Sequence, residues 1–215
     1  MSDVFAAIEA GDEATAVAFL RAEPRLAHVP GPGGATPVLH AMYRGQGTLA
    51  RALAAEVAEL DLADAAAIDA TDRVRELLAT DLDVVDGRTP DGFTPLQLAA
   101  FFGAPGAAGL LIEAGADVNA VANNPMRIQP LHAAAAGRHG DIAKLLIGAG
   151  ADVNGRQQHD FTPLHAAAQN GDTDLLDALL AAGADPAATT DDGRVAATLA
   201  EAAGHESIAV RLAAR

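Results

Sequence analysis

Residues 162–168 read Thr-Pro-Leu-His-Ala-Ala-Ala, and two similar stretches precede them, Gln-Pro-Leu-His-Ala-Ala-Ala at 129–135 and Thr-Pro-Leu-Gln-Leu-Ala-Ala at 94–100. Their prolines, Pro95, Pro130 and Pro163, are 35 and 33 residues apart. Twenty residues after each proline a second marker begins, Gly-Ala-Asp-Val-Asn in the first two copies and Gly-Ala-Asp-Pro-Ala in the third. Two markers at a fixed offset in three copies indicate a repeated structural unit.

Weaker copies of the unit appear once this phase is set. Counting 33 residues on from Pro163 reaches Ala196, and upstream units fit when phased from Asp3, Pro37 and Asp61. The sequence therefore predicts seven helix pairs, phased from residues 3, 37, 61, 95, 130, 163 and 196. The second unit is only 24 residues long, so we expect it to lack the projecting loop of the others.

Each unit has the local signals of two short helices. A threonine before the proline supplies an N-cap hydroxyl, and proline at the first helical position has no N–H to leave unpaired. A second apolar segment with helical spacing follows and ends at a glycine, as in residues 141–150. The alanines at Ala99, Ala134 and Ala167 allow neighbouring units to approach closely, so stacking builds one continuous core. The predicted fold class is an all-α solenoid.

The segment 160–171, Asp-Phe-Thr-Pro-Leu-His-Ala-Ala-Ala-Gln-Asn-Gly, together with the Gly-Ala-Asp marker, resembles the ankyrin repeat. The chain as a whole is similar to small bacterial ankyrin-repeat proteins. The resemblance implies one domain over residues 1–215, with degenerate units in 1–89, well-matched repeats with hairpin-like loops in 90–195, and a capping unit in 196–215. The departures are Gln97 for the motif histidine, Gln129 for threonine, Arg138 in a glycine slot, and Val-Ala-Ala at 195–197 in place of Thr-Pro-Leu.

Composition narrows the class of function. The chain has 29 Asp and Glu against 14 Lys and Arg, a formal charge of −15, which disfavours nucleic acid and anionic membranes as partners. It contains no cysteine, and we expect neither an export signal nor a membrane-spanning segment. We expect a cytoplasmic, monomeric protein.

The residues offer little for catalysis or metal binding. Serine occurs only at Ser2 and Ser207 and lysine only at Lys144, so covalent mechanisms lack a nucleophile. The resemblance implies that His132 and His165 hydrogen-bond the adjoining hairpin, and the other histidines lack ligand spacing. The Gly-Pro-Gly-Gly loop at 31–34 lacks the Lys-Ser/Thr pair of a phosphate loop, and we interpret it as a linker. We therefore expect no enzyme activity, no cofactor and no metal.

By exclusion and by resemblance, the predicted function is binding of a protein partner. Ankyrin arrays bind through a concave surface made of hairpin tips and two variable positions near the end of each first helix. Five of the seven aromatic residues fall at such positions, where the repeat does not demand them. The predicted partner-binding residues are Tyr43, Phe93, Phe101, Phe102, Asn123, Asn124, Met126, Arg127, Arg138, His159, Phe161, Gln169 and Asn170.

Residues 123–127, Asn-Asn-Pro-Met-Arg, are the strongest single candidate for partner contact. The alternative is a loop variant that only caps its own hairpin through the Asn side chains. The proline spacing of 35 exceeds the later 33 while the offset to the Gly-Ala-Asp marker is unchanged, so two extra residues lie in a hairpin. Residues 120–160 carry a balance of +1 in this acidic chain. One hypothesis is a basic face around Arg127 and Arg138 that binds a partner with an acidic and apolar epitope, and the alternative is that these are scattered solvated charges. Two alternatives remain open: an intracellular inhibitor or immunity-type protein for a basic target, and an atypical enzyme using groove carboxylates with His139 or His159.

Overall fold

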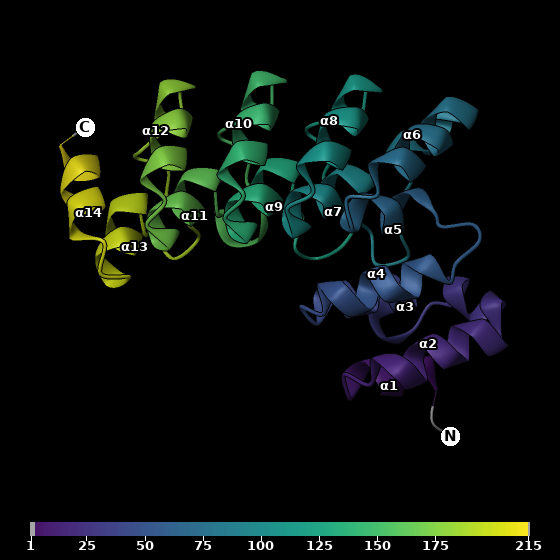
Figure 1. Cartoon of the computed structure of the whole chain (residues 1–215). Coiled ribbons are helices and arrows are strands. Elements are labelled where there is room, and N and C mark those ends of the chain that lie inside the picture. Colours follow the sequence, from purple (N-terminus) through teal and green to yellow (C-terminus); the bar gives the residue numbers. More distant parts are fainter. Residues whose placement is uncertain (1–2, 215) are drawn as a thin grey trace.

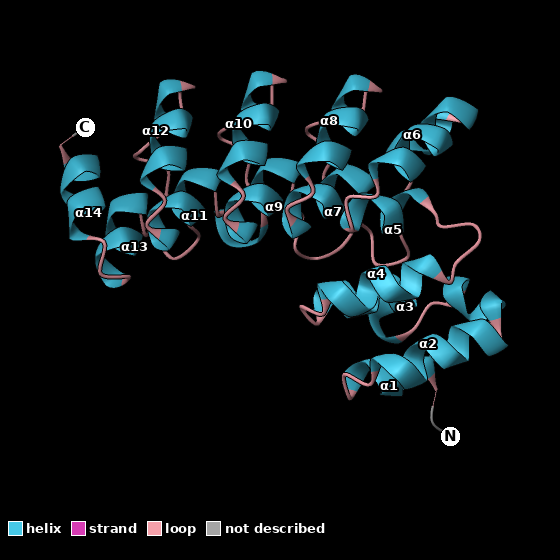
Figure 2. Cartoon of the chain, viewed as in Figure 1, coloured by secondary structure: helices cyan, strands magenta, loops and turns pink. Residues whose placement is uncertain are grey.

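The computed structural model describes residues 3–214 and stacks seven helix–turn–helix pairs side by side (Figures 1 and 2). The described residues contain no β-strand, only an isolated bridge between Thr189 and Val195. The predicted all-α solenoid of seven units is thus confirmed. The pairs are α1 (Val4–Glu9) and α2 (Glu13–Ala22); α3 (Pro37–Tyr43) and α4 (Gly47–Ala55); α5 (Leu62–Ala67) and α6 (Thr71–Thr80); α7 (Pro95–Phe102) and α8 (Pro105–Glu113); α9 (Pro130–Gly137) and α10 (Gly140–Gly148); α11 (Pro163–Asn170) and α12 (Thr173–Ala181); α13 (Ala196–Ala202) and α14 (Glu206–Ala213). Short 3-10 turns are η1 (Pro24–His28), η2 (Pro32–Gly34), η3 (Leu82–Asp86) and η4 (Gln158–Asp160).

The first helices begin where the threonine–proline signal predicts. The hydroxyls of Thr36, Thr94 and Thr162 each accept a hydrogen bond from the backbone N–H three residues on. Each such cap is worth about 1 kcal/mol, because it satisfies a donor that the helix itself cannot pair. The units therefore set their own boundaries locally, before any packing between them.

Alanine lets the first helices pack closely. Ala99 on α7, Ala134 on α9 and Ala167 on α11 are fully buried between neighbouring units. Leucines beside them, such as Leu131 and Leu164, fill the space toward the second helices and are 1% exposed. Since each helix pair buries its apolar side only against its neighbours, the core runs the length of the stack.

A buried side chain from each of the central first helices ties the unit to the following loop. Nε2 of His132 bonds the carbonyl of Gly155 at 3.0 Å, and Nε2 of His165 bonds that of Ala188 at 3.1 Å. Their Nδ1 atoms accept from backbone N–H groups, so Nε2 carries the proton. Burial lowers the pKa of His132 to about 4, which keeps the ring neutral. In α7 the side chain of Gln97 ties the helix to the following loop in the same way, because its Nε2 donates to Ala120 O and Ile128 O at 2.8 Å.

The stack changes direction after the second unit. In Figure 1, α1–α4 lie across the direction of the helices from α7 onward. The connection from α4 to α5 has only residues 56–61 and no projecting loop, as expected from the short second unit. The loop at 31–35 consequently reaches the hairpin at 88–93: a Cβ built on Gly34 would lie 3.2 Å from Asp91 N.

Candidate functional site

Four hairpin tips project on one side of the stack: residues 88–93, 123–128, 156–161 and 189–194. Three are closed by backbone hydrogen bonds between residues four apart, such as Gln157 N to Phe161 O. In the second tip the closing bond joins Ala122 N to Ile128 O, six residues apart. The two additional residues of the long repeat are therefore in the tip itself, and the helices on either side keep their register.

Backbone hydrogen bonds join this tip to its neighbours. Asn123 N donates to Gly92 O at 2.9 Å, and Gln158 N donates to Met126 O at 3.0 Å. The Asn124 side chain makes two further bonds: its Nδ2 donates to Asp91 O, and its Oδ1 accepts from Met126 N. Asn124 thus caps its own turn and also fixes that turn against the preceding tip.

An apolar groove opens beside this tip, with a volume of about 520 Å³. Its walls come from three separate places: the loop 31–35, the tips 88–93 and 123–128, and the inner helices α3 and α7. We define the apolar groove by its lining residues, which are Pro32, Gly33, Ala35, Tyr43, Asp91, Phe93, Gln97, Leu98, Phe101, Asn124, Pro125, Met126 and Ile128.

Aromatic rings form the helix-side wall of the apolar groove. Tyr43 and Phe102 have ring centroids 5.4 Å apart, and Phe101 meets Phe102 edge-on at 5.1 Å. The Tyr43 hydroxyl donates to Asp91 Oδ2 at 2.7 Å. Burial first, and then this hydrogen bond, raise the pKa of Tyr43 well above its usual value, so the phenol stays protonated. The rings are consequently fixed in place before any ligand arrives.

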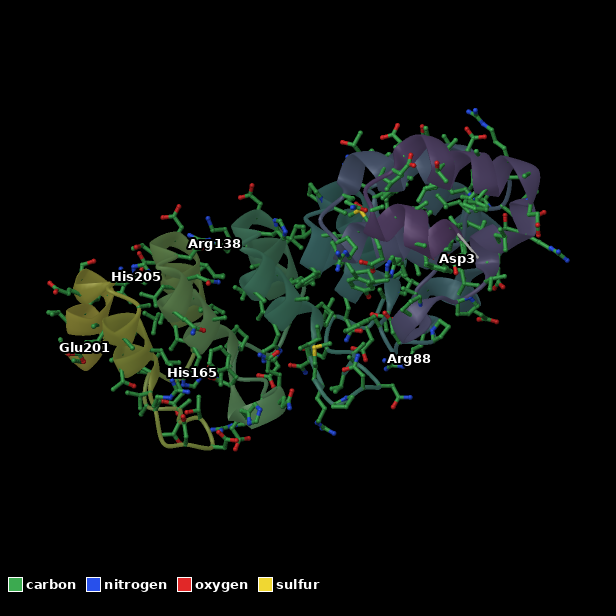
Figure 3. All side chains as sticks on the ribbon, turned by 90° about the horizontal axis from the view of Figure 1, so that it is seen from below. Asp3, Arg88, Arg138, His165, Glu201 and His205 are labelled. Carbon is green, nitrogen blue, oxygen red and sulfur yellow. The ribbon has the colours of Figure 1, made fainter. Side chains whose placement is uncertain are left out.

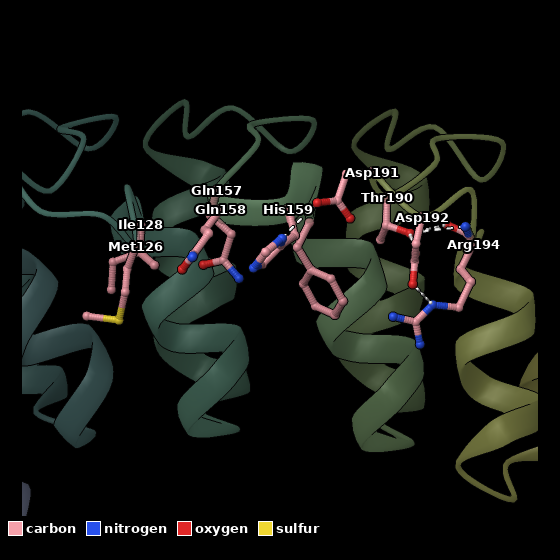
Figure 4. Close-up of a pocket in the computed structure, with 10 residues that line it drawn as sticks. Met126, Ile128, Gln157, Gln158, His159, Thr190, Asp191, Asp192 and Arg194 are labelled. Carbon is pink, nitrogen blue, oxygen red and sulfur yellow. Dashed lines mark hydrogen bonds and ion pairs between the residues drawn. The ribbon is translucent and has the colours of Figure 1, made fainter.

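A second, polar groove lies on the other side of the same tip and also measures about 520 Å³ (Figure 4). His159 Nδ1 lies 2.7 Å from Asp191 Oδ2, and Arg194 Nε lies 2.8 Å from Asp192 Oδ2. Hydrogen bonds from Arg194 and Thr190 lower the pKa of Asp192 to about 2. These charges pair within the protein. The residues that line the polar groove are Met126, Ile128, Gln157, Gln158, His159, Phe161, Thr190, Asp191, Asp192 and Arg194.

Seven of the thirteen residues predicted to bind a partner line one of the two grooves: Tyr43, Phe93, Phe101, Asn124, Met126, His159 and Phe161. The other six line neither groove: Phe102, Asn123, Arg127, Arg138, Gln169 and Asn170. Phe93 is only 8% exposed, because it closes a small core of its own with Ala35, Leu39 and Leu98. Gln169 and Asn170 lie at the far end of α11, where Asn170 Nδ2 donates to Ala135 O.

The predicted basic face around Arg127 and Arg138 is wrong. Arg127 precedes α9, whereas Arg138 is the C-cap of that helix, so the two residues stand at opposite ends of eight helical residues, about 12 Å. Figure 3 shows Arg138 on the edge of the stack away from the hairpin loops. His139 is not free either, since its Nε2 lies 3.1 Å from Phe101 O.

Charge on the four tips is balanced. Each tip carries one arginine, and the four arginines are matched by four aspartates, so the tips sum to zero while the chain carries −15. Three arginines have partners inside the protein: Arg88 donates to Gly92 O, Arg156 to Thr189 O, and Arg194 pairs with Asp192. Within residues 3–214 the guanidinium of Arg127 has no hydrogen bond or ion pair.

Residues 3–214 offer no site for a metal ion and no membrane span. No group of three or more His, Asp or Glu side chains there is arranged to hold a metal ion. None of the helices described has both the length and the apolar character needed to span a bilayer.

Comparison with known protein families settles the architecture. Residues 121–190 match the family model described as ankyrin repeats in three copies, and residues 91–123 match that of the single ankyrin repeat. The chain is an ankyrin-repeat protein. The matches cover the units around α7 to α12, and the ankyrin units before and after them follow the same helix-pair plan in the structure. A search of curated proteins found no match to the sequence.

Two features of the ankyrin stack were missed from the sequence. The loop 31–35, interpreted as a linker, is a wall of the apolar groove, and the short spacing from Pro37 to Asp61 was the available signal. Asp64, which occupies the slot of the motif histidine, is 2% exposed and accepts a hydrogen bond from Thr36 Oγ1 at 2.6 Å.

Proposed function

We propose that this ankyrin-repeat protein is a non-enzymatic module that binds a protein partner through its hairpin tips and inner helices. Ankyrin repeats are in general protein–protein interaction modules, and the finer assignment rests on one observation. Of the eight large apolar residues exposed among those described, three line the apolar groove: Tyr43, Phe101 and Met126, at 39%, 40% and 45% exposure. Clustered exposed apolar side chains typically mark an interaction site.

The cytoplasm is the proposed compartment, and the absence of cysteine from the whole chain supports it. The charge distribution does not favour the alternative of an inhibitor of a basic target. The −15 charge resides outside the four tips, which sum to zero, so the proposed contact surface is not itself acidic. No observation favours the atypical enzyme, because His139 bonds a backbone carbonyl and His159 pairs with Asp191 on an open surface.

A quantitative pull-down from the native host tests the proposal. The wild type is compared with a Phe101→Ala/Met126→Ala variant, which removes two exposed side chains from the apolar groove. Leu145→Ala is the matched control, because Leu145 on α10 is 41% exposed and lies outside both grooves. We expect a partner that the control recovers and the double variant loses by ~10-fold or more. Equal recovery by the wild type and the double variant would refute binding through this groove.

A further inference from the structure

The apolar groove lacks the polar groups that orient a small ligand. Its one carboxylate, Asp91, already accepts hydrogen bonds from the hydroxyls of Tyr43 and Thr89. The Gln97 amide donates to two backbone carbonyls. Small-molecule sites combine apolar walls with several convergent polar groups, so an open groove with its polar groups already paired suits an apolar side chain of a longer chain.

A polar group is available at Arg127, which we call the lip of the groove. Arg127 lies between Met126 and Ile128, which both line the groove. It is exposed, and within residues 3–214 it is the one tip arginine whose guanidinium has no partner. Its planar fork is suited to a carboxylate, which it can bind through two parallel hydrogen bonds. Because the four tips sum to zero charge, they do not repel an acidic segment.

The lip is also held in one conformation. Arg127 has a φ of +51°, a left-handed conformation that is uncommon for arginine, and its N–H donates to Asn124 O at 3.1 Å. The Asn124 side chain bonds both Met126 N and Asp91 O, which ties the turn to the preceding tip. A pre-organised turn loses little entropy when a ligand binds.

We propose that the apolar groove and Arg127 together recognise a short segment of a protein partner that combines an apolar anchor with a nearby carboxylate. The aromatic or large aliphatic anchor enters between Tyr43, Phe101 and Met126. An Asp or Glu a few residues away along the segment pairs with Arg127. This inference rests on the proposed function and specifies the chemistry of the partner.

A phage-displayed library of random 12-residue peptides, selected against the immobilised full-length chain, provides the probe. We expect enriched peptides to contain an aromatic or large aliphatic residue within about three positions of Asp or Glu. The best-enriched peptide is then synthesised, and its affinity is measured by fluorescence polarisation. Selection of peptides without a carboxylate, or no enrichment at all, would overturn the proposal.

Variants separate the two parts of the recognition. Met126→Ala and Phe101→Ala are each expected to weaken the peptide by ~10-fold, and Arg127→Glu by ~10-fold or more. Arg138→Glu is the matched charge control and should leave affinity within about twofold, because Arg138 lies at the other end of α9. Replacing the peptide carboxylate by lysine should restore binding to Arg127→Glu. Far-UV circular dichroism confirms that each variant is folded.

The failure of this inference can be distinguished from failure of the proposed function. Recovery of a host partner could require Phe101 and Met126 and yet be unaffected by Arg127→Glu. That result would support the proposed function but refute the inference that the partner presents a carboxylate to Arg127. Equal affinity of the peptide for wild type and Arg127→Glu has the same meaning. Host recovery that is insensitive to Phe101→Ala/Met126→Ala would instead remove the proposed function, and the inference with it.

Discussion

Replacing Asp64 by asparagine should stabilise the protein at neutral pH. Asp64 lies three residues after the N-cap of α5, as His132 and His165 do in α9 and α11. The residue is nevertheless only 2% exposed, and its carboxyl accepts only the Thr36 hydroxyl among the hydrogen bonds of the described residues. Burial, followed by repulsion from Asp61, raises its pKa to about 8. Asparagine has nearly the same shape and keeps an oxygen for Thr36, so it removes the titration with little change in packing.

The direction of the pH dependence follows from the number of protons that each state binds. An unfolded aspartate ionises near pH 3.9, whereas the folded Asp64 keeps its proton up to about pH 8. Between these values the folded state holds more protons, so the free energy of unfolding falls by about 1.36 kcal/mol per pH unit as pH rises. Below pH 4 and above pH 8 this contribution no longer changes. From pH 5 to pH 7 the wild type should lose about 3 kcal/mol relative to Asp64→Asn.

Urea denaturation of both proteins at pH 5, 6 and 7 measures this difference. His132 and His165 also titrate across the range, but they do so in both proteins and cancel from the comparison. Asp72→Asn is the control for replacing an aspartate by asparagine, because Asp72 on α6 has a side chain that is 94% exposed. If the difference in unfolding free energy between wild type and Asp64→Asn stays constant from pH 5 to pH 7, the reasoning is refuted, since Asp64 would then be ionised in the folded protein.

Two further changes test the inter-unit contacts. His132→Gln should reduce acid sensitivity: the folded pKa of about 4 lies below the unfolded 6.5, so stability present at pH 7 is lost as pH falls, about 2 kcal/mol by pH 5. The glutamine should take the place of His132 as Gln97 does in α7. If wild type and His132→Gln lose the same unfolding free energy between pH 7 and pH 5 in urea denaturation, the prediction is wrong. Gly92→Ala should destabilise by about 2 kcal/mol or more, because φ is +91° and the added Cβ would lie 2.5 Å from Asn123 O. Gly193→Ala is the control, because Gly193 has a φ of +81° and open space around it, so its alanine causes only backbone strain. Equal melting temperatures for the two alanine variants would show that the Cβ at residue 92 does not clash with Asn123 O.

Much of the fold could be predicted because its signals are local. The Thr-Pro starts and the glycine stops act within a few residues, and together with the constant 20-residue offset they set the phase from which all seven helix pairs were counted. The same arithmetic located the insertion at 123–127. The pairing of His132 and His165 with the next hairpin followed from the resemblance and is confirmed by their bonds to Gly155 O and Ala188 O.

The bend between the second and third units could not be predicted in the same way. It brings the loop 31–35 against the tip 88–93. The 24-residue spacing of the second unit predicts the missing hairpin, but not which segments meet in its place. Phe93 was expected on the surface because its burial depends on Ala35 and Leu39, which reach it only across the bend. Asp64 was not singled out from the sequence, because its hydrogen-bond partner, Thr36, belongs to another unit.

Met126 lines both grooves, and this gives the second tip a consequence for stoichiometry. One thioether side chain cannot project fully into both spaces at once. Two separate ligands would therefore compete for it, and occupancy of one groove would lower the affinity of the other. A single chain crossing the tip would instead use Met126 at its midpoint and gain avidity from both sides. If both grooves take ligands, Met126 in the lengthened tip would thermodynamically link the occupancy of one groove to that of the other.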